Sequence, residues 1–227
     1  MALRRKEKRT ERSKLDATPP WDTTRHHDAV VTTGPYDLAD EPSDGRQRLD
    51  LGALRIPAET GLEIRVEVAE QGQVAGVTLL NEVGQMQLGV FAAPRNEGIW
   101  DEVRAEIKAS ISQQGGTVNE REGTFGTELA GMLPAPNGVT PVRFLGVDGP
   151  RWFLRAMLAG APAVDDAQAT PFLETFRGVV VVRGGEPLPV REPVPLELPH
   201  EAAEQVAAAA EQAAQEQASP AQPGEQA

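Results

Sequence analysis

The hydrophobic pattern changes its period between residues 62 and 114, and this change limits the possible folds more than any other feature of the sequence. From residue 62 to residue 68 apolar and charged side chains alternate strictly, as in a strand with one buried face. Two more strand-like segments follow at 74–80 and 85–92. We expect these three segments to pair as an antiparallel meander, because parallel pairing requires a connection of a dozen or more residues.

The period then becomes helical. From residue 98 to residue 114 apolar side chains, including Trp100 and Ile107, recur at steps of three and four, which predicts an amphipathic helix. Asn96 is a suitable N-cap, and Gly115 with Gly116 would end the helix. Spacing places Trp100 in the core, and we expect the same of Trp152.

The rest of the folded region is predicted as four strands, a second helix and a final strand. The strands are expected at 117–122, 125–132, 142–147 and 151–158, the helix at 166–177 and the last strand at 179–182. Pro171 would be tolerated only in the first turn of that helix. The predicted class is therefore α+β, a mainly antiparallel sheet flanked by two helices, in the order β-β-β-α-β-β-β-β-α-β.

Composition divides the chain into four parts. Residues 1–48 are polar and lack sustained periodicity, and we expect a disordered tail there. Residues 49–186 form the predicted α+β domain, and residues 187–199 carry five prolines, which favours an extended strap. Residues 200–227 are mostly Ala, Glu and Gln, and we expect a second disordered tail.

Two short aromatic islands interrupt the first tail: Pro-Trp-Asp with Trp21 and Asp22, and Pro-Tyr-Asp with Tyr36 and Asp37. A large aromatic side chain in a polar segment has no local core to explain it. Each island therefore either folds back into a groove of the domain or docks on a partner protein, since Trp and Tyr are enriched among residues that dominate interfaces. Chance occurrence is the third possibility.

Three arginines are candidates for binding an anion. If the Asp-Gly-Pro sequence at 148–150 forms the hairpin turn and Val147 pairs with Arg151, then Arg143 lies beside Arg155. Arg143, Arg151 and Arg155 would then surround a carboxylate or phosphate, which guanidinium groups bind with two parallel hydrogen bonds. The alternative is that these arginines pair with acids of neighbouring strands, namely Glu63, Glu67 or Glu128.

The residue types that most catalytic and metal sites require are scarce. The chain has no cysteine, which excludes thiolate metal sites, disulfides and a cysteine nucleophile. Its three histidines, at 26, 27 and 200, all lie in the predicted tails. We therefore expect a protein that is not an enzyme, with no catalytic residues, no metal site and no cofactor.

Charge and hydropathy give expectations for the binding partners and the cellular location of the protein. The net charge is −12, yet residues 1–14 carry seven basic and two acidic side chains, a local charge of +5. We expect at most weak polyanion binding by this segment, because the acidic remainder repels the same partners. No stretch approaches the roughly 20 apolar residues of a membrane span, and the start lacks the apolar core of a secretory signal. A cytoplasmic location is expected.

Four strings resemble an actinobacterial family catalogued as domain of unknown function thirty-seven-ten. They are FAAPR at 91–95, GIW at 98–100, QQGG at 113–116 and VDGPRWFLR at 147–155. The resemblance extends over roughly residues 45–198, and the Pro-Trp-Asp island is similar too. It implies no activity, and by fold-level analogy it suggests antiparallel α/β/α sandwiches of the PsbP and Mog1 kind.

Two functions follow as hypotheses. The first is a non-enzymatic interaction or adaptor protein with a protein partner of unknown identity and unknown oligomeric state. The second is a small domain that binds an anionic ligand through the arginines. A deep pocket larger than about 300 Å³ lined by these arginines would favour the second hypothesis.

Overall fold

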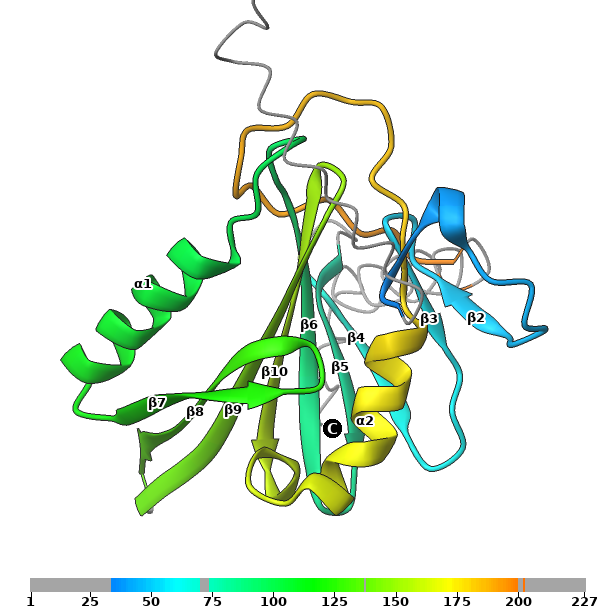
Figure 1. The fold of residues 1–227 in the computed structure, drawn as a ribbon. Coiled ribbons are helices and arrows are strands. Elements are labelled where there is room, and N and C mark those ends of the chain that lie inside the picture. Colours follow the sequence, from blue (N-terminus) through cyan, green and yellow to red (C-terminus); the bar gives the residue numbers. More distant parts are fainter. Residues whose placement is uncertain (1–33, 70–73, 137, 200–201, 203–227) are drawn as a thin grey trace, which may run out of the picture. The chain divides into compact units, whose positions relative to one another are not determined.

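The computed structural model describes residues 34–69, 74–136, 138–199 and 202 (Figure 1). All of them belong to one unit that begins at Val31. The predicted α+β class and the order of ten elements are confirmed, and three short strands precede those elements.

A seven-stranded antiparallel sheet is the largest element of the fold, with the strand order β4-β5-β6-β10-β9-β8-β7. Its strands form two meanders, β4-β5-β6 and β7-β8-β9-β10, which are joined by pairing between β6 and β10. The strand bounds are Glu63–Val68 (β4), Val74–Asn81 (β5), Gly84–Ala92 (β6), Thr117–Gly123 (β7), Gly126–Ala135 (β8), Gly138–Gly149 (β9) and Trp152–Gly160 (β10).

A second sheet has four short strands in the order β1-β11-β3-β2. They are Tyr36–Asp37 (β1), Arg48–Asp50 (β2), Leu54–Pro57 (β3) and Val180–Val181 (β11), and the turns Leu38–Asp40 (η2) and Ala161–Ala163 (η3) are 3-10 helices. The expected boundary at residue 48 is wrong, because residues 34–48 contribute β1, η2 and the first residue of β2 to the folded unit. β1 pairs in parallel with β11, a strand more than 140 positions away in the sequence, so no local pattern marks it.

Two hydrophobic clusters lie on opposite faces of the large sheet. Along β10 the side chains alternate between them: Trp152 and Leu154 belong to the first cluster, and Phe153 to the second. Helix α2 (Asp166–Gly178) and β3 complete the first cluster, and α1 (Trp100–Gln113) completes the second above β7, β8 and β9 (Figure 1). Trp100 and Trp152 are 7% and 2% exposed, so their predicted core positions are confirmed.

The α1 side of β4, β5 and β6 is largely polar. Its side chains include Glu63 and Arg65 of β4 and Gln85 and Gln87 of β6, all exposed. Helix α1 packs on the other half of the same face, over β7 to β9. This face of β4, β5 and β6 is therefore exposed among the described residues.

The ends of the helices depart from the prediction. Asn96 does not cap α1. Instead Asp148 of β9 accepts hydrogen bonds from the backbone N–H groups of Ile99 (2.8 Å) and Trp100 (3.2 Å). The sequence predicted Pro171 in the first turn of α2, but it lies in the second turn.

The proline-rich strap, residues 187–199, is extended and bonded to both sheets. The N–H of Arg191 donates to the carbonyl of Ala92 (2.7 Å), and the N–H of Glu197 donates to the carbonyl of Leu51 (2.9 Å). The Arg191 side chain donates hydrogen bonds to Glu102 and Glu106 of α1 at 2.6 Å each.

No helix in the part of the chain described by the structure is long and apolar enough to cross a membrane.

Candidate functional site

The register of the β9–β10 hairpin decides where the three candidate arginines lie. Gly149 pairs with Trp152, so Pro150 and Arg151 form the turn, and Arg151 has a positive φ of 66°. Val147 pairs with Leu154 and not with Arg151, so the expected register is wrong by three residues. A shift by an odd number moves side chains to the opposite face of a sheet, so the expected three-arginine cluster does not form.

Arg143 faces the α2 side and lies in a buried charge cluster. It pairs across the sheet with Leu158, and its Nε donates to Glu128 Oε2 at 2.7 Å. Its Nη1 donates to Asp166 Oδ1 at 2.8 Å, at the first residue of α2. Arg143 and Glu128 are each 1% exposed. Of the two alternatives, the structure therefore shows pairing with an acid for Arg143.

Arg121 of β7 completes this charge cluster. Its Nη2 donates to Asp166 Oδ1 at 2.9 Å, and its Nε lies 3.7 Å from Glu128 Oε2. The hydrogen bond and charge of the Arg121 guanidinium, with a smaller contribution from Arg143, hold the pKa of the Asp166 carboxyl below its usual value, although burial acts in the opposite direction. The buried Glu128 Oε1 has no hydrogen-bond partner among the described residues. Two cations and two anions thus tie the start of α2 to β7, β8 and β9.

Arg151 points away from Arg143 and holds a loop. Its Nη2 donates to the carbonyl of Gly184 at 2.9 Å. Its own carbonyl accepts hydrogen bonds from Ala93 N–H (3.0 Å) and from Arg183 Nε (3.1 Å). These contacts join the hairpin turn to the end of β6 and to residues 183–184, which precede the strap.

Arg155 lies on the α1 side of β10, opposite to Arg143, and pairs across the sheet with Gly89. Its guanidinium carbon is 5.1 Å from the centre of the Phe91 ring, a cation–π contact. It makes no salt bridge or hydrogen bond with any residue that the structure describes. Burial lowers the pKa of the Arg155 guanidinium from its ordinary value.

A small hollow, the Arg155 cavity, lies between this side chain and the strap. It has a volume of about 220 Å³ and is lined by parts of β5, β6, β10 and strap residues 193–196. The cavity is smaller than the roughly 300 Å³ at which ligand pockets begin. Of the three candidate arginines, Arg155 is the one that lines it.

The second aromatic island is bound to the folded unit itself. Tyr36 N–H donates to the carbonyl of Val179 at 2.8 Å. Asp37 Oδ1 accepts from Ala39 N–H at 3.1 Å, and its Oδ2 accepts from Trp152 Nε1 at 2.9 Å. The structure thus gives intramolecular docking for Tyr36 and Asp37, whereas Trp21 and Asp22 lie outside the described residues.

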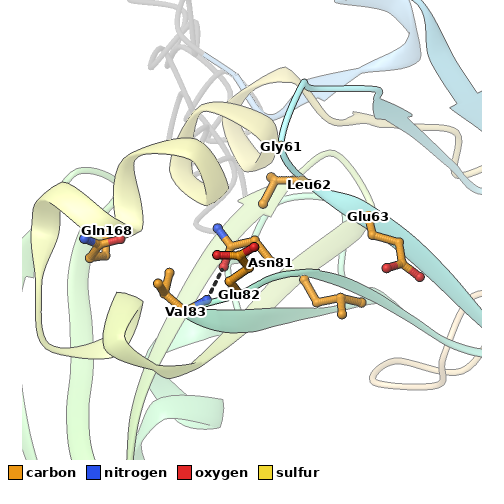
Figure 2. A pocket seen from close by; sticks show the side chains of 8 residues that line it. Gly61, Leu62, Glu63, Asn81, Glu82, Val83 and Gln168 are labelled. Atoms are coloured by element: carbon orange, nitrogen blue, oxygen red, sulfur yellow. Dashed lines mark hydrogen bonds between the residues drawn. The ribbon is translucent and has the colours of Figure 1, made fainter.

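A broad open depression was not expected from the sequence. We call it the β4 depression; its volume is about 810 Å³, and it lies between the start of β4, the β5–β6 turn and Gln168 of α2 (Figure 2). Asn81 Oδ1 shapes the turn by accepting from the N–H groups of Val83 and Gly84, both at 3.1 Å. The other residues that line the β4 depression are Gly61, Leu62, Glu63, Leu80 and Glu82.

Comparison with known proteins identifies the family. A family model described as Protein of unknown function (DUF3710) matches residues 34–205. The chain belongs to this family. The DUF3710 match begins two residues before β1 and includes the strap, which agrees with the folded boundary seen in the structure.

No curated protein matches the DUF3710 chain. A crystal structure of a protein from Bacteroides thetaiotaomicron VPI-5482, at 1.50 Å resolution, is similar with 12% identity and a TM-score of 0.38. The similarity covers 63% of this chain and 52% of that one, so the DUF3710 chain spans about half the length of the solved protein.

Proposed function

We propose that the protein is a non-enzymatic interaction protein of the cytoplasm, and that it docks an extended segment of a partner protein at the β4 depression. The observation that carries this proposal is that the start of an edge strand lines the depression. β4 is the terminal strand of the seven-stranded sheet and pairs with β5 on one side. The start of β4 forms one wall of the depression.

An edge strand offers backbone N–H and C=O groups that an extended peptide can pair with. The β4 depression adds side chains suited to such a peptide. Leu62, Leu80 and Val83 provide apolar contact, and Val83 is 40% exposed. Glu82 is exposed, and Glu63 lies nearby in a pair with Arg65. A segment that alternates apolar side chains with lysine or arginine fits these surroundings best.

The shape also favours a peptide over a compact ligand. A volume of about 810 Å³ that is largely open to solvent offers little enclosure. Small-molecule sites usually bury most of the ligand. An extended segment gains its affinity from repeated backbone bonds, which need length and not depth.

The test is site-specific photo-crosslinking in cells of the source organism. A photo-reactive amino acid placed at Glu82 is expected to capture one partner, and the same group at the exposed Ala109 of α1 is the matched control. In the protein that carries the photo-reactive group at position 82, the additional substitution Glu63→Lys should abolish cross-linking to the partner. Equal capture from both positions, or capture that survives the charge reversal, would contradict the proposal.

The anionic-ligand hypothesis loses its original basis. It required Arg143, Arg151 and Arg155 in one cluster, and the structure places Arg143 and Arg155 on opposite faces with Arg151 in the turn. Arg143 is already neutralised by Glu128 and Asp166. Of the three candidate arginines, Arg155 is the one whose guanidinium has no salt bridge or hydrogen bond with a described residue.

A further inference from the structure

We propose that the Arg155 cavity is a binding site for the carboxylate group of a short-chain acid or of an acidic side chain. This inference is independent of the β4 depression, which lies on other residues of the sheet. It follows from three features of the cavity: an arginine without an acidic partner among the described residues, glycines in its lining and a fixed strap along one side.

The cavity exists because β5 and β6 separate. Their ladder ends at the pair Val77–Leu88, and beyond it the strap pairs with both strands instead. Pro193 bridges to Phe91 and Leu196 bridges to Val74. The N–H of Val194 donates to the carbonyl of Val90 at 3.0 Å. The strap is therefore paired with both strands where they diverge.

Two glycines line the cavity. A Cβ at Gly89 would lie 3.0 Å from the Phe91 ring, so a side chain there would fill space that the ring now occupies. A Cβ at Gly76 would lie 3.5 Å from Glu67 Oε2 and 3.8 Å from Gln87 Nε2. The absence of side chains at these two positions leaves room in the hollow, and Glu67 and Gln87 lie beside Gly76.

The charge of Arg155 is not offset by any acid that the structure describes. Partly burying a guanidinium removes some of its hydration, and this cost is usually met by a carboxylate or by hydrogen bonds. The Phe91 contact is a cation–π interaction, which satisfies none of the five N–H donors. A carboxylate matches these donors in charge and in geometry.

The volume limits the size of the bound group. At about 30 Å³ for each water molecule, 220 Å³ holds about seven waters. A carboxylate on a chain of three to five carbons fills this space, and Gln87 can hydrogen-bond to its far end.

Two sources present such a carboxylate. One is a free small acid. The other is the segment 200–227 of this chain, which follows the strap directly and contains five glutamates and no lysine or arginine. The glutamates are Glu201, Glu204, Glu211, Glu216 and Glu225.

The experiment uses the full ¹⁵N-labelled chain and sodium glutarate at constant ionic strength. The backbone amides of Gly76 and Gly89 are expected to shift saturably, with a dissociation constant on the order of 1 mM, about −4 kcal/mol. Glutaramide, the uncharged diamide of the same length, should bind at least tenfold more weakly. This comparison needs no variant, so it does not depend on the folding of a mutant.

Variants then assign the site. Arg155→Gln should abolish the shifts, and Arg65→Gln, on the same face of the sheet but exposed and paired with Glu63, should retain them. No saturable shift, equal binding of glutaramide, or unchanged binding by Arg155→Gln would overturn the proposal.

The full chain with its five C-terminal glutamates changed to glutamine identifies the source. If glutarate binds this variant at least threefold more tightly than the wild type, the site is occupied by a tail glutamate in the native chain. Equal affinity for the two chains assigns the site to a free small acid. Both results require the saturable shifts at Gly76 and Gly89 and so support the site itself.

Discussion

Replacing Glu128 by leucine should destabilise the protein strongly. Glu128 and Arg143 are each 1% exposed, and Arg143 Nε lies 2.7 Å from Glu128 Oε2. Without Glu128, Arg143 keeps only Asp166, whose side chain is 71% exposed and therefore well solvated. Removing one partner of a buried pair leaves an uncompensated charge, which typically costs about 3–5 kcal/mol.

The double variant Glu128→Leu/Arg143→Met should be more stable than Glu128→Leu alone. Both charges are then replaced by apolar side chains of similar size, and such replacements are often neutral or stabilising. The coupling free energy between the two positions should therefore exceed about 2 kcal/mol, in the range found for residues in direct contact. The surface pair between Arg191 and Glu106 is the control, and Arg191→Met should cost at most about 1 kcal/mol.

Urea denaturation followed by circular dichroism measures these differences, with the slope of the transition checked for each variant. The expected order of midpoints is wild type and Arg191→Met highest, the double variant next, and Glu128→Leu lowest. A Glu128→Leu midpoint equal to that of Arg191→Met would refute the reasoning, as would a double variant less stable than Glu128→Leu.

Three further predictions concern separate parts of the chain. Asp148→Ala should lower the free energy of unfolding by about 1–2 kcal/mol, because it removes the cap of α1, whereas Asn96→Ala should leave it within about 0.5 kcal/mol; urea titration compares them. The hydrogen bond from Arg48 lowers the pKa of Asp44 from 3.8 to about 2, so its stabilising contribution is present above pH 3.8 and is lost as the pH falls through 2. Carboxyl NMR should give that midpoint, and a value near 3.8 would contradict the pairing. A peptide of residues 1–14 should bind heparin weakly at low salt and lose binding as salt rises, which fluorescence anisotropy detects; nanomolar binding that resists salt would exclude this expectation.

Much of the fold was predictable because its signals are local. The alternation from Leu62 to Val68 and the three- and four-residue steps from Trp100 to Ile111 each depend on neighbours in the sequence. β4 and α1 accordingly lie within the predicted ranges. The candidate site was much less predictable, because it depends on which strands meet and in which register.

The sequence by itself determined the order of ten strands and helices, the buried positions of Trp100 and Trp152 and the extended strap. Tertiary structure alone decided the register of the β9–β10 hairpin, where the positive φ of Arg151 moves the turn and sends Arg143 and Arg155 to opposite faces. It also decided that Asp148 caps α1 from 48 residues away and that Asp37 bonds to Trp152 across 115 residues. The physical reason is that hydrophobic period reports which face of a segment is buried, whereas these partners meet only when distant segments pack together.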